Sequence, residues 1–205
     1  MHTVQSKSIE IKMKRNLIEY LRDYGEISEA DAQMILAAFE PVTFKRGEWL
    51  SKAGTLSRKL YFMHEGILKI TISDEGGDEL VYFFMEGNQF MGFLYSMYGN
   101  VPTLQGLQAA TDTELSVIDK ESLFTLYKNL PYLKPLIDHI AYLSMTEMVN
   151  IRNNYLAGSA REKYQLLLKK QPEVALYVMQ MDIASYLSIT PESLSRIRSQ
   201  HHKKE

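Results

Sequence analysis

The feature that most constrains the fold is the pattern of apolar, small and cap-forming residues over residues 180–204. Residues 180–187 carry apolar and small side chains with a helical period. Residues 188–190 interrupt that period. Thr190 and Pro191 then have the residue types that begin a helix, because a threonine side chain can cap free N–H groups and a proline lacks one. The stretch therefore predicts two short helices joined by a three-residue turn.

The second of these helices has an apolar face and a polar face. Leu194 and Ile197 form the apolar face, and Ala184 supplies a small residue where the two helices can cross. The residues predicted to point outward are Glu192, Ser193, Ser195, Arg196 and Ser199. A polar second helix in this arrangement indicates a DNA-binding helix-turn-helix. The alternative is an ordinary helical hairpin with Arg196 and Arg198 as solvated surface residues, since short motifs of this kind also recur by chance.

The distribution of charge supports a nucleic-acid partner for the C-terminal part. The net charge of the 205 residues is −2, but residues 159–205 hold eight Lys or Arg against five Asp or Glu. The sequence has 45% hydrophobic and 23% charged residues, which is ordinary for a globular protein with a sizeable core. No apolar stretch approaches the roughly 20 residues that a membrane span needs, and residues 1–15 do not resemble a signal peptide. We therefore expect a cytoplasmic protein without a membrane partner.

The residue types exclude several kinds of site. Cysteine is absent, which excludes disulfides, thiol nucleophiles and cysteine-ligated clusters. The five histidines show no metal-ligand spacing, and no nucleophile–base pair or phosphate loop is visible. We therefore expect no enzyme activity, no metal site and no resident cofactor.

The hydrophobic period changes twice along the rest of the chain. Helical spacing occurs at 14–24 and 28–39, where Ser28 followed by Asp31 predicts a helix N-cap. Short β-branched and aromatic segments follow at 42–50, 61–72, 80–84 and 113–118, with a turn signal at 74–78 and glycines between them. Several short strands at close spacing indicate a sandwich or barrel, so the predicted fold class is α+β.

Helical spacing returns after residue 120 and dominates a long stretch. A helix starting near Pro131 and reaching Tyr155 would be about 36 Å long at 1.5 Å per residue. Its apolar residues fit either a core helix or a helix that pairs with a second copy of the chain. Ala157-Gly158-Ser159 then predicts a domain boundary, with Ser159 as the N-cap of the next helix.

The order of these parts resembles the CRP/FNR family of bacterial transcription regulators. The segments that carry the resemblance are Phe44–Glu48, Tyr61–Gly66, Gly87–Gly92, Ser159–Tyr164 and Asp182–Arg196. The resemblance implies an N-terminal double-stranded β-helix or jelly-roll barrel of the cyclic-nucleotide-binding type with flanking helices over 1–130. It also implies a long dimerisation helix over 131–158 and a C-terminal winged-helix-type helix-turn-helix domain over 159–205. The implied function is a homodimer that binds palindromic double-stranded DNA, with RNA polymerase as a protein partner.

The resemblance also suggests which side chains contact DNA. Glu192 and Arg196 match the family's base-reading positions, while Pro191 replaces a frequent arginine. Glutamate can accept a hydrogen bond from cytosine and arginine can make two bonds to guanine. The predicted DNA-binding residues are Thr190, Glu192, Ser193, Ser195, Arg196 and Arg198, with Ser193, Ser195 and Arg198 as phosphate or secondary contacts.

The usual ligand site of the family departs from its pattern here. Family members that bind cyclic nucleotide use a glycine-glutamate pair and an arginine, but Gly92 is followed by Phe93 and residues 87–113 contain no Lys or Arg. We therefore expect no cyclic AMP binding of the usual kind. The candidate effector pocket comprises Phe83, Gly92, Phe93, Tyr95 and Thr103, and plain barrel core is the alternative for these residues. The alternative function is a ligand- or protein-binding module with a vestigial DNA-binding domain, and the effector is unknown.

Overall fold

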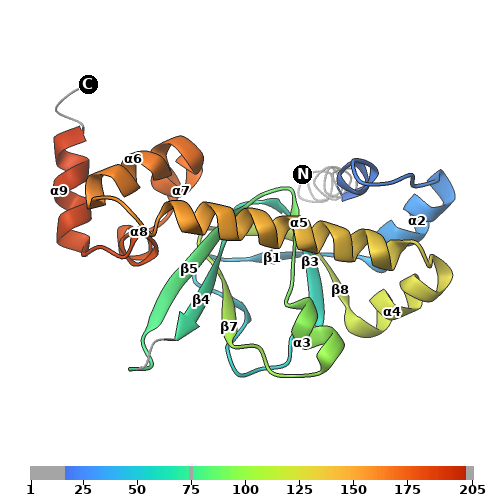
Figure 1. Cartoon of the computed structure of the whole chain (residues 1–205). Coiled ribbons are helices and arrows are strands. Elements are labelled where there is room, and N and C mark those ends of the chain that lie inside the picture. Colours follow the sequence, from blue (N-terminus) through green and yellow to red (C-terminus); the bar gives the residue numbers. More distant parts are fainter. Residues whose placement is uncertain (1–16, 74–75, 202–205) are drawn as a thin grey trace, which may run out of the picture.

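The computed structural model describes residues 17–73 and 76–201 (Figure 1). Predictions for residues 14–16, for Asp74 and Glu75, and for the tail beyond His201 lie outside the described residues. The remainder of the chain forms a β-barrel with helices at both ends, joined by one long helix (Figure 1).

Two four-stranded antiparallel sheets form the barrel. The strands are β1 (Glu40–Phe44), β2 (Trp49–Ser51), β3 (Lys59–Glu65), β4 (Ile67–Ser73), β5 (Glu79–Glu86), β6 (Gln89–Met91), β7 (Gln105–Ala109) and β8 (Thr113–Asp119). Their order is β1-β8-β3-β6 in one sheet and β2-β7-β4-β5 in the other. The predicted α+β class with an antiparallel barrel is confirmed.

Strand β3 is buried on both of its faces, and the two faces belong to different cores. Tyr61 and Met63 point into the barrel, where they join the core between the two sheets. Leu60 and Phe62 point outward into a second core beneath the helices. This double burial explains why the strand reads as a continuous apolar run and does not alternate with polar residues.

Strands β3 and β4 follow each other in sequence but lie in different sheets. Gly66 between them has φ +100°, and a Cβ there would lie 2.5 Å from the carbonyl oxygen of Asp112. A glycine is needed at this corner because only it tolerates both the backbone angle and the close approach.

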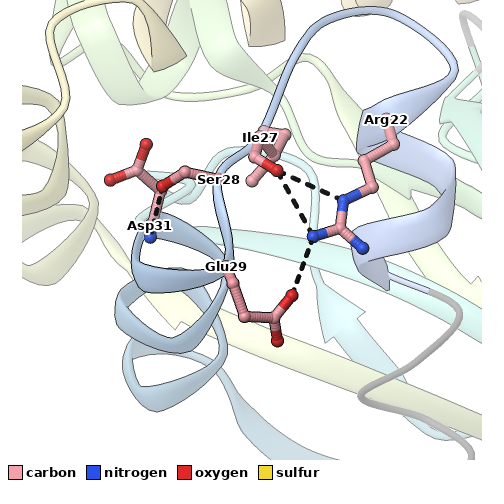
Figure 2. Close-up of polar contacts among 5 residues, drawn as sticks. All are labelled: Arg22, Ile27, Ser28, Glu29 and Asp31. Atoms are coloured by element: carbon pink, nitrogen blue, oxygen red, sulfur yellow. Dashed lines mark hydrogen bonds and ion pairs between the residues drawn. The ribbon is translucent and has the colours of Figure 1, made fainter.

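Helices cover the outer face of the first sheet. They comprise residues 17–22, α2 (Glu29–Ala38) and α4 (Lys120–Asn129). The Ser28 hydroxyl accepts a hydrogen bond of 3.1 Å from the Asp31 N–H, which confirms the predicted N-cap (Figure 2). The Arg22 guanidinium donates to the carbonyl oxygen of Ile27 and to Glu29, at 3.3 and 3.1 Å, and ties the first helix to α2 (Figure 2).

The long helix α5 (Leu133–Asn154) runs across the barrel from α4 to the C-terminal helices (Figure 1). Its buried residues Leu133, Ile137 and Ile140 pack in the outer core. The short helix α3 (Leu94–Gly99) lies between β6 and β7 in the chain. The predicted long helix is therefore present, and one face of its N-terminal half packs as core.

Four helices form the C-terminal part: α6 (Ala160–Lys170), α7 (Pro172–Tyr177), α8 (Gln180–Leu187) and α9 (Pro191–His201). Ser159 caps α6 in a capping box with Glu162, as predicted for Ser159. Residues 120–201, all of which the structure describes, contain no strand. The β-stranded wing implied by the predicted winged-helix type is therefore absent from this part of the chain. A single core of buried residues continues from the barrel interior into these helices.

Candidate nucleic-acid interface and effector cavity

Helices α8 and α9 are joined by the tight turn that the sequence predicts. Ser188 adopts a left-handed conformation at φ 54° and ψ 49°, which ends α8. The Ile189 N–H donates to the Ala184 carbonyl at 3.0 Å, and the Ile189 side chain packs against the core. The Thr190 hydroxyl accepts from the Ser193 N–H at 3.2 Å, so Thr190 caps α9. These contacts fix how α9 leaves the turn.

The buried face of α9 orients its polar face outward. Leu194 is fully buried and Ile197 packs against the same core. Glu192, Ser195 and Arg196 are exposed on the other side. Within the described residues, no hydrogen bond or ion pair engages the side chain of Glu192 or Arg196, so both are available to a ligand.

The other predicted DNA-binding residues lie at the margins of this face. Thr190 serves as the cap, and its hydroxyl also donates to the Ser193 hydroxyl at 3.1 Å. Ser193 and Arg198 are half-buried on the flanks of α9. Gln200 is exposed one turn beyond Arg196 and was missing from the predicted set, although the same helical period points to it. The open face therefore centres on Glu192, Ser195 and Arg196.

A cavity of about 270 Å³ lies between the barrel and α5. It sits where β5 and β6, the edge strands of the two sheets, leave an opening that α5 covers. The residues that line it are Leu60, Ile70, Phe83, Met85, Gln89, Phe90, Met91, Gly92, Phe93, Leu94, Tyr95, Gln105, Ile137, Ala141, Ser144, Met145 and Met148. None of these side chains is charged, and four are methionines, which adapt easily to a bound shape.

Four of the five predicted pocket residues line this cavity, and Thr103 does not. Phe83, Gly92, Phe93 and Tyr95 are part of the wall. Thr103 is fully buried behind it, with its hydroxyl 2.8 Å from that of Tyr95. The structure therefore does not place Thr103 in the wall of the cavity, because its hydroxyl holds the loop after α3. A Cβ on Gly92 would lie 3.0 Å from the carbonyl oxygen of Lys59, so the glycine is explained by close packing onto β3.

Three backbone N–H groups that follow α3 already have partners within the chain. The Leu104 N–H donates to the Tyr95 hydroxyl and the Gln105 N–H to the Thr103 hydroxyl, both at 3.1 Å. The Thr103 N–H donates to the Thr55 carbonyl at 2.9 Å. An anion bound here would find no cation and would have to break these bonds, which is unfavourable. The cavity therefore fits an uncharged molecule better than a phosphate ester.

Two features are absent from the described part of the chain. No helix there is long and apolar enough to span a membrane. No group of three or more His, Asp or Glu side chains there is placed to hold a metal ion.

Comparison with known proteins agrees with this architecture. Residues 41–129 match the family model of the cyclic nucleotide-binding domain. Comparison with curated protein sequences gives no match. Among solved structures, the chain is similar to the c-di-GMP-responsive global regulator CLP of Xanthomonas campestris, with 16% identity and a TM-score of 0.67. That similarity covers 86% of this chain and 93% of CLP.

Two other regulators show the same fold. FixK2 of Bradyrhizobium japonicum has 17% identity and a TM-score of 0.65, covering 81% of this chain and 85% of FixK2. A CooA mutant from Carboxydothermus hydrogenoformans has 16% identity and a TM-score of 0.61, covering 92% of this chain and 84% of CooA. The predicted resemblance to CRP/FNR regulators is thus confirmed at the level of the fold.

Proposed function

We propose that this chain is a sequence-specific transcription regulator that binds double-stranded DNA as a homodimer. The observation that carries the proposal is the exposed face of α9, where Glu192 and Arg196 lie one turn apart near the helix N-terminus without partners among the described residues. The N-terminal residues of a recognition helix are those that reach base edges in the major groove. Arg196 would bind guanine and Glu192 would accept from cytosine. RNA polymerase is the protein partner we expect for such a regulator.

The exposed side of α5 supports the homodimer. Tyr142, Met145 and Val149 are 61, 55 and 43% exposed and follow each other at spacings of three and four residues. This is the heptad spacing by which two helices pair. A second copy of the chain on this face would bring two recognition helices into successive major grooves, about 34 Å apart on a palindromic site.

Val149→Glu tests the dimer without touching α9. Sedimentation velocity should show a monomer at concentrations where the unchanged chain is dimeric, because a charge would enter the apolar seam. Thr125→Glu, on the exposed side of α4, is the matched control and should stay dimeric. Equal association of both variants would exclude α5 as the interface.

The cavity supports an effector other than cyclic AMP. Its wall is uncharged, and the nearby N–H donors of Leu104 and Gln105 are bonded to hydroxyls of the chain itself. A phosphate would be desolvated there without compensation. We propose that Phe83, Gly92, Phe93 and Tyr95 contact an uncharged, largely apolar molecule. Native mass spectrometry of the purified chain would detect such a molecule by its mass.

A binding selection on random duplex DNA tests the DNA-reading role. We expect one palindromic sequence to be enriched, and Arg196→Ala to lose that preference. Arg161→Ala removes another exposed arginine of the same domain, from α6. This variant should keep the preference for the enriched palindrome. The proposal fails if no palindrome is enriched and Arg196→Ala binds DNA as the unchanged chain does.

The second candidate function is a ligand- or protein-binding module whose helix-turn-helix no longer reads DNA. The cavity is the observation that favours it, together with the modest charge of residues 159–205. Weak binding of all DNA sequences at low salt, beside tight retention of a small molecule, would support this candidate over the first.

A further inference from the structure

The C-terminal helices cover the open edge of the barrel. Strand β5 is the last strand of its sheet, so one row of its backbone groups has no strand partner. The Val81 N–H donates to the Ser185 hydroxyl of α8 at 2.9 Å. The Phe84 carbonyl accepts from the Gln171 amide at 3.2 Å. The edge of the sheet is thus completed by side chains of the helix-turn-helix domain.

An ion pair also joins the barrel to the C-terminal helices. The Lys69 ammonium of β4 lies 2.7 Å from the Asp182 carboxylate of α8. These side chains are only 14 and 18% exposed, whereas the Lys45–Asp112 pair elsewhere on the barrel is 77 and 62% exposed. Removing one partner of a shielded pair leaves an uncompensated charge, so loss of Lys69 or Asp182 should disturb this contact more than loss of one partner disturbs an exposed pair.

Tyr186 joins α8 to both the barrel and the long helix. It is fully buried, and its hydroxyl donates to the Gln171 side-chain oxygen at 2.9 Å. Its carbonyl accepts from the Arg152 guanidinium of α5 at 2.6 Å. Its ring meets that of Phe84 edge-on at 5.0 Å. Burial raises the pKa of Tyr186, so the hydroxyl remains a donor.

The recognition helix stays uncovered while α8 is docked. In Figure 1, α9 lies at the far end of the C-terminal helices, on the side away from the sheets. Within the described residues, the hydrogen bonds that Thr190, Ser193, Ser195 and Ser199 make with their side chains remain inside the helix-turn-helix. The docking of α8 therefore leaves the reading face of α9, which is formed by Glu192, Ser195 and Arg196, exposed.

We propose that an edge latch, made of the Lys69–Asp182, Val81–Ser185 and Phe84–Gln171 contacts, sets the orientation of α9 relative to α5. Lys69, Asp182, Ser185 and Gln171 are then positioning residues for DNA recognition that do not touch DNA. In a dimer paired through α5, a fixed orientation of α9 fixes the distance and phase between the two recognition helices. The latch therefore determines which half-site spacing the dimer accepts. This inference rests on the proposed function, since spacing has a meaning only for a dimeric DNA reader.

Affinity for operators of changed spacing tests the latch. The probes are the palindrome enriched by selection and versions with two base pairs inserted at its centre, which turn one half-site by about 70°. The unchanged chain should bind the inserted probe at least about tenfold more weakly than the original palindrome. Lys69→Met should reduce that penalty to about threefold or less, because the C-terminal helices can then reorient. The charge-exchanged variant Lys69→Glu with Asp182→Lys should restore the penalty.

A matched control separates positioning from general destabilisation. Arg22→Met removes an ion pair with Glu29 among the N-terminal helices, at the other end of the molecule (Figures 1 and 2). It should keep the spacing penalty of the unchanged chain. The latch is overturned if Lys69→Met discriminates between the two spacings as sharply as the unchanged chain does.

Hydrogen exchange at the Val81 amide provides a readout that needs no DNA. The amide should be protected in the unchanged chain and should exchange about tenfold faster in Ser185→Ala, while the Lys69 amide in β4 stays protected. If selection enriches no palindrome, the proposed function fails and this measurement still decides whether the edge is latched. Rapid exchange of Val81 in the unchanged chain would overturn the latch itself.

Discussion

The reading face of α9 and the cavity beneath α5 differ most in charge and in exposure. Glu192 and Arg196 are exposed, charged and unpaired within the described residues, whereas the cavity wall contains no charged side chain. The first is suited to base edges and phosphates, and the second to an apolar molecule. Under the proposed function, a chain with the fold of CRP/FNR regulators would keep side chains for DNA reading while its barrel lacks the charges that hold a phosphate.

The two regions also differ in how their polar groups are satisfied. Around α9, the cap and turn contacts leave the side chains of Glu192 and Arg196 without partners within the described residues. Around the cavity, the hydroxyls of Tyr95 and Thr103 already bind the N–H groups that an anion would need. Side-chain hydroxyls of the chain itself therefore take up backbone donors beside the cavity, whereas no such contact engages Glu192 or Arg196 within the described residues.

Arg196→Lys should have the largest effect on the DNA side of this comparison. Lysine keeps the charge but cannot form two parallel bonds to guanine, so specific affinity should fall by about 1–3 kcal/mol per half-site. Fluorescence anisotropy with the selected operator measures the loss. Binding to random DNA and its dependence on salt should be nearly unchanged. An equal loss on specific and random DNA would mean that Arg196 contacts phosphate only.

Burial also excludes charge at His64, which lies beside Phe62 on the outer side of β3, and pH tests this exclusion. His64 is 5% exposed, and burial lowers its pKa to about 4. The unfolded state then binds more protons than the folded state between pH 6.5 and about 4, so stability falls as the pH is lowered through this window. The loss in the free energy of unfolding that this titration causes is at most about 3 kcal/mol.

Urea unfolding at a series of pH values measures this slope. His64→Asn keeps a polar side chain for the Ser116 hydroxyl, which lies 2.9 Å from the His64 Nε2, and removes the titration. The fall in stability between pH 6.5 and 4 should be smaller in this variant. An unchanged slope would assign the pH dependence to other groups.

Thr190→Ala should have the smallest effect of the three. It removes the cap of α9, which stabilises helices by about 1 kcal/mol. The midpoint of thermal unfolding should fall slightly, and specific DNA affinity should fall with it because the first turn of α9 frays. Thr190→Ser keeps the hydroxyl and serves as the control. A full loss of DNA binding by Thr190→Ala at unchanged stability would instead indicate a direct contact with DNA.

The helix-turn-helix could be predicted because its signals are local. The cap at Thr190, the proline after it and the buried Leu194 lie within five residues, and each has a conformational reason to be there. The Ser159 cap and the strand segments are predictable on the same grounds. Helix α5 could not be assigned from its period alone, and the structure shows that one side packs as core while Tyr142 and Val149 remain exposed on the other.

The cavity and the edge latch depend on contacts between distant residues. Lys69 and Asp182 are separated by 113 positions, and no local pattern indicates that they meet. The resemblance predicts Thr103 for the pocket, but its hydroxyl lies 2.8 Å from that of Tyr95 and it does not line the cavity. Such features follow from how the sheets and helices assemble, which spacing and composition do not specify.

Affinity for the selected operator, measured with and without saturating cyclic AMP, is the sharpest test of the proposed DNA-binding function and of the proposed indifference to cyclic AMP. We predict specific binding by the chain alone and no more than about a twofold change on addition of the nucleotide, because the cavity wall has no charged side chain to pair with a phosphate. Specific binding that appears only with cyclic AMP, or that strengthens about tenfold or more, would contradict this prediction.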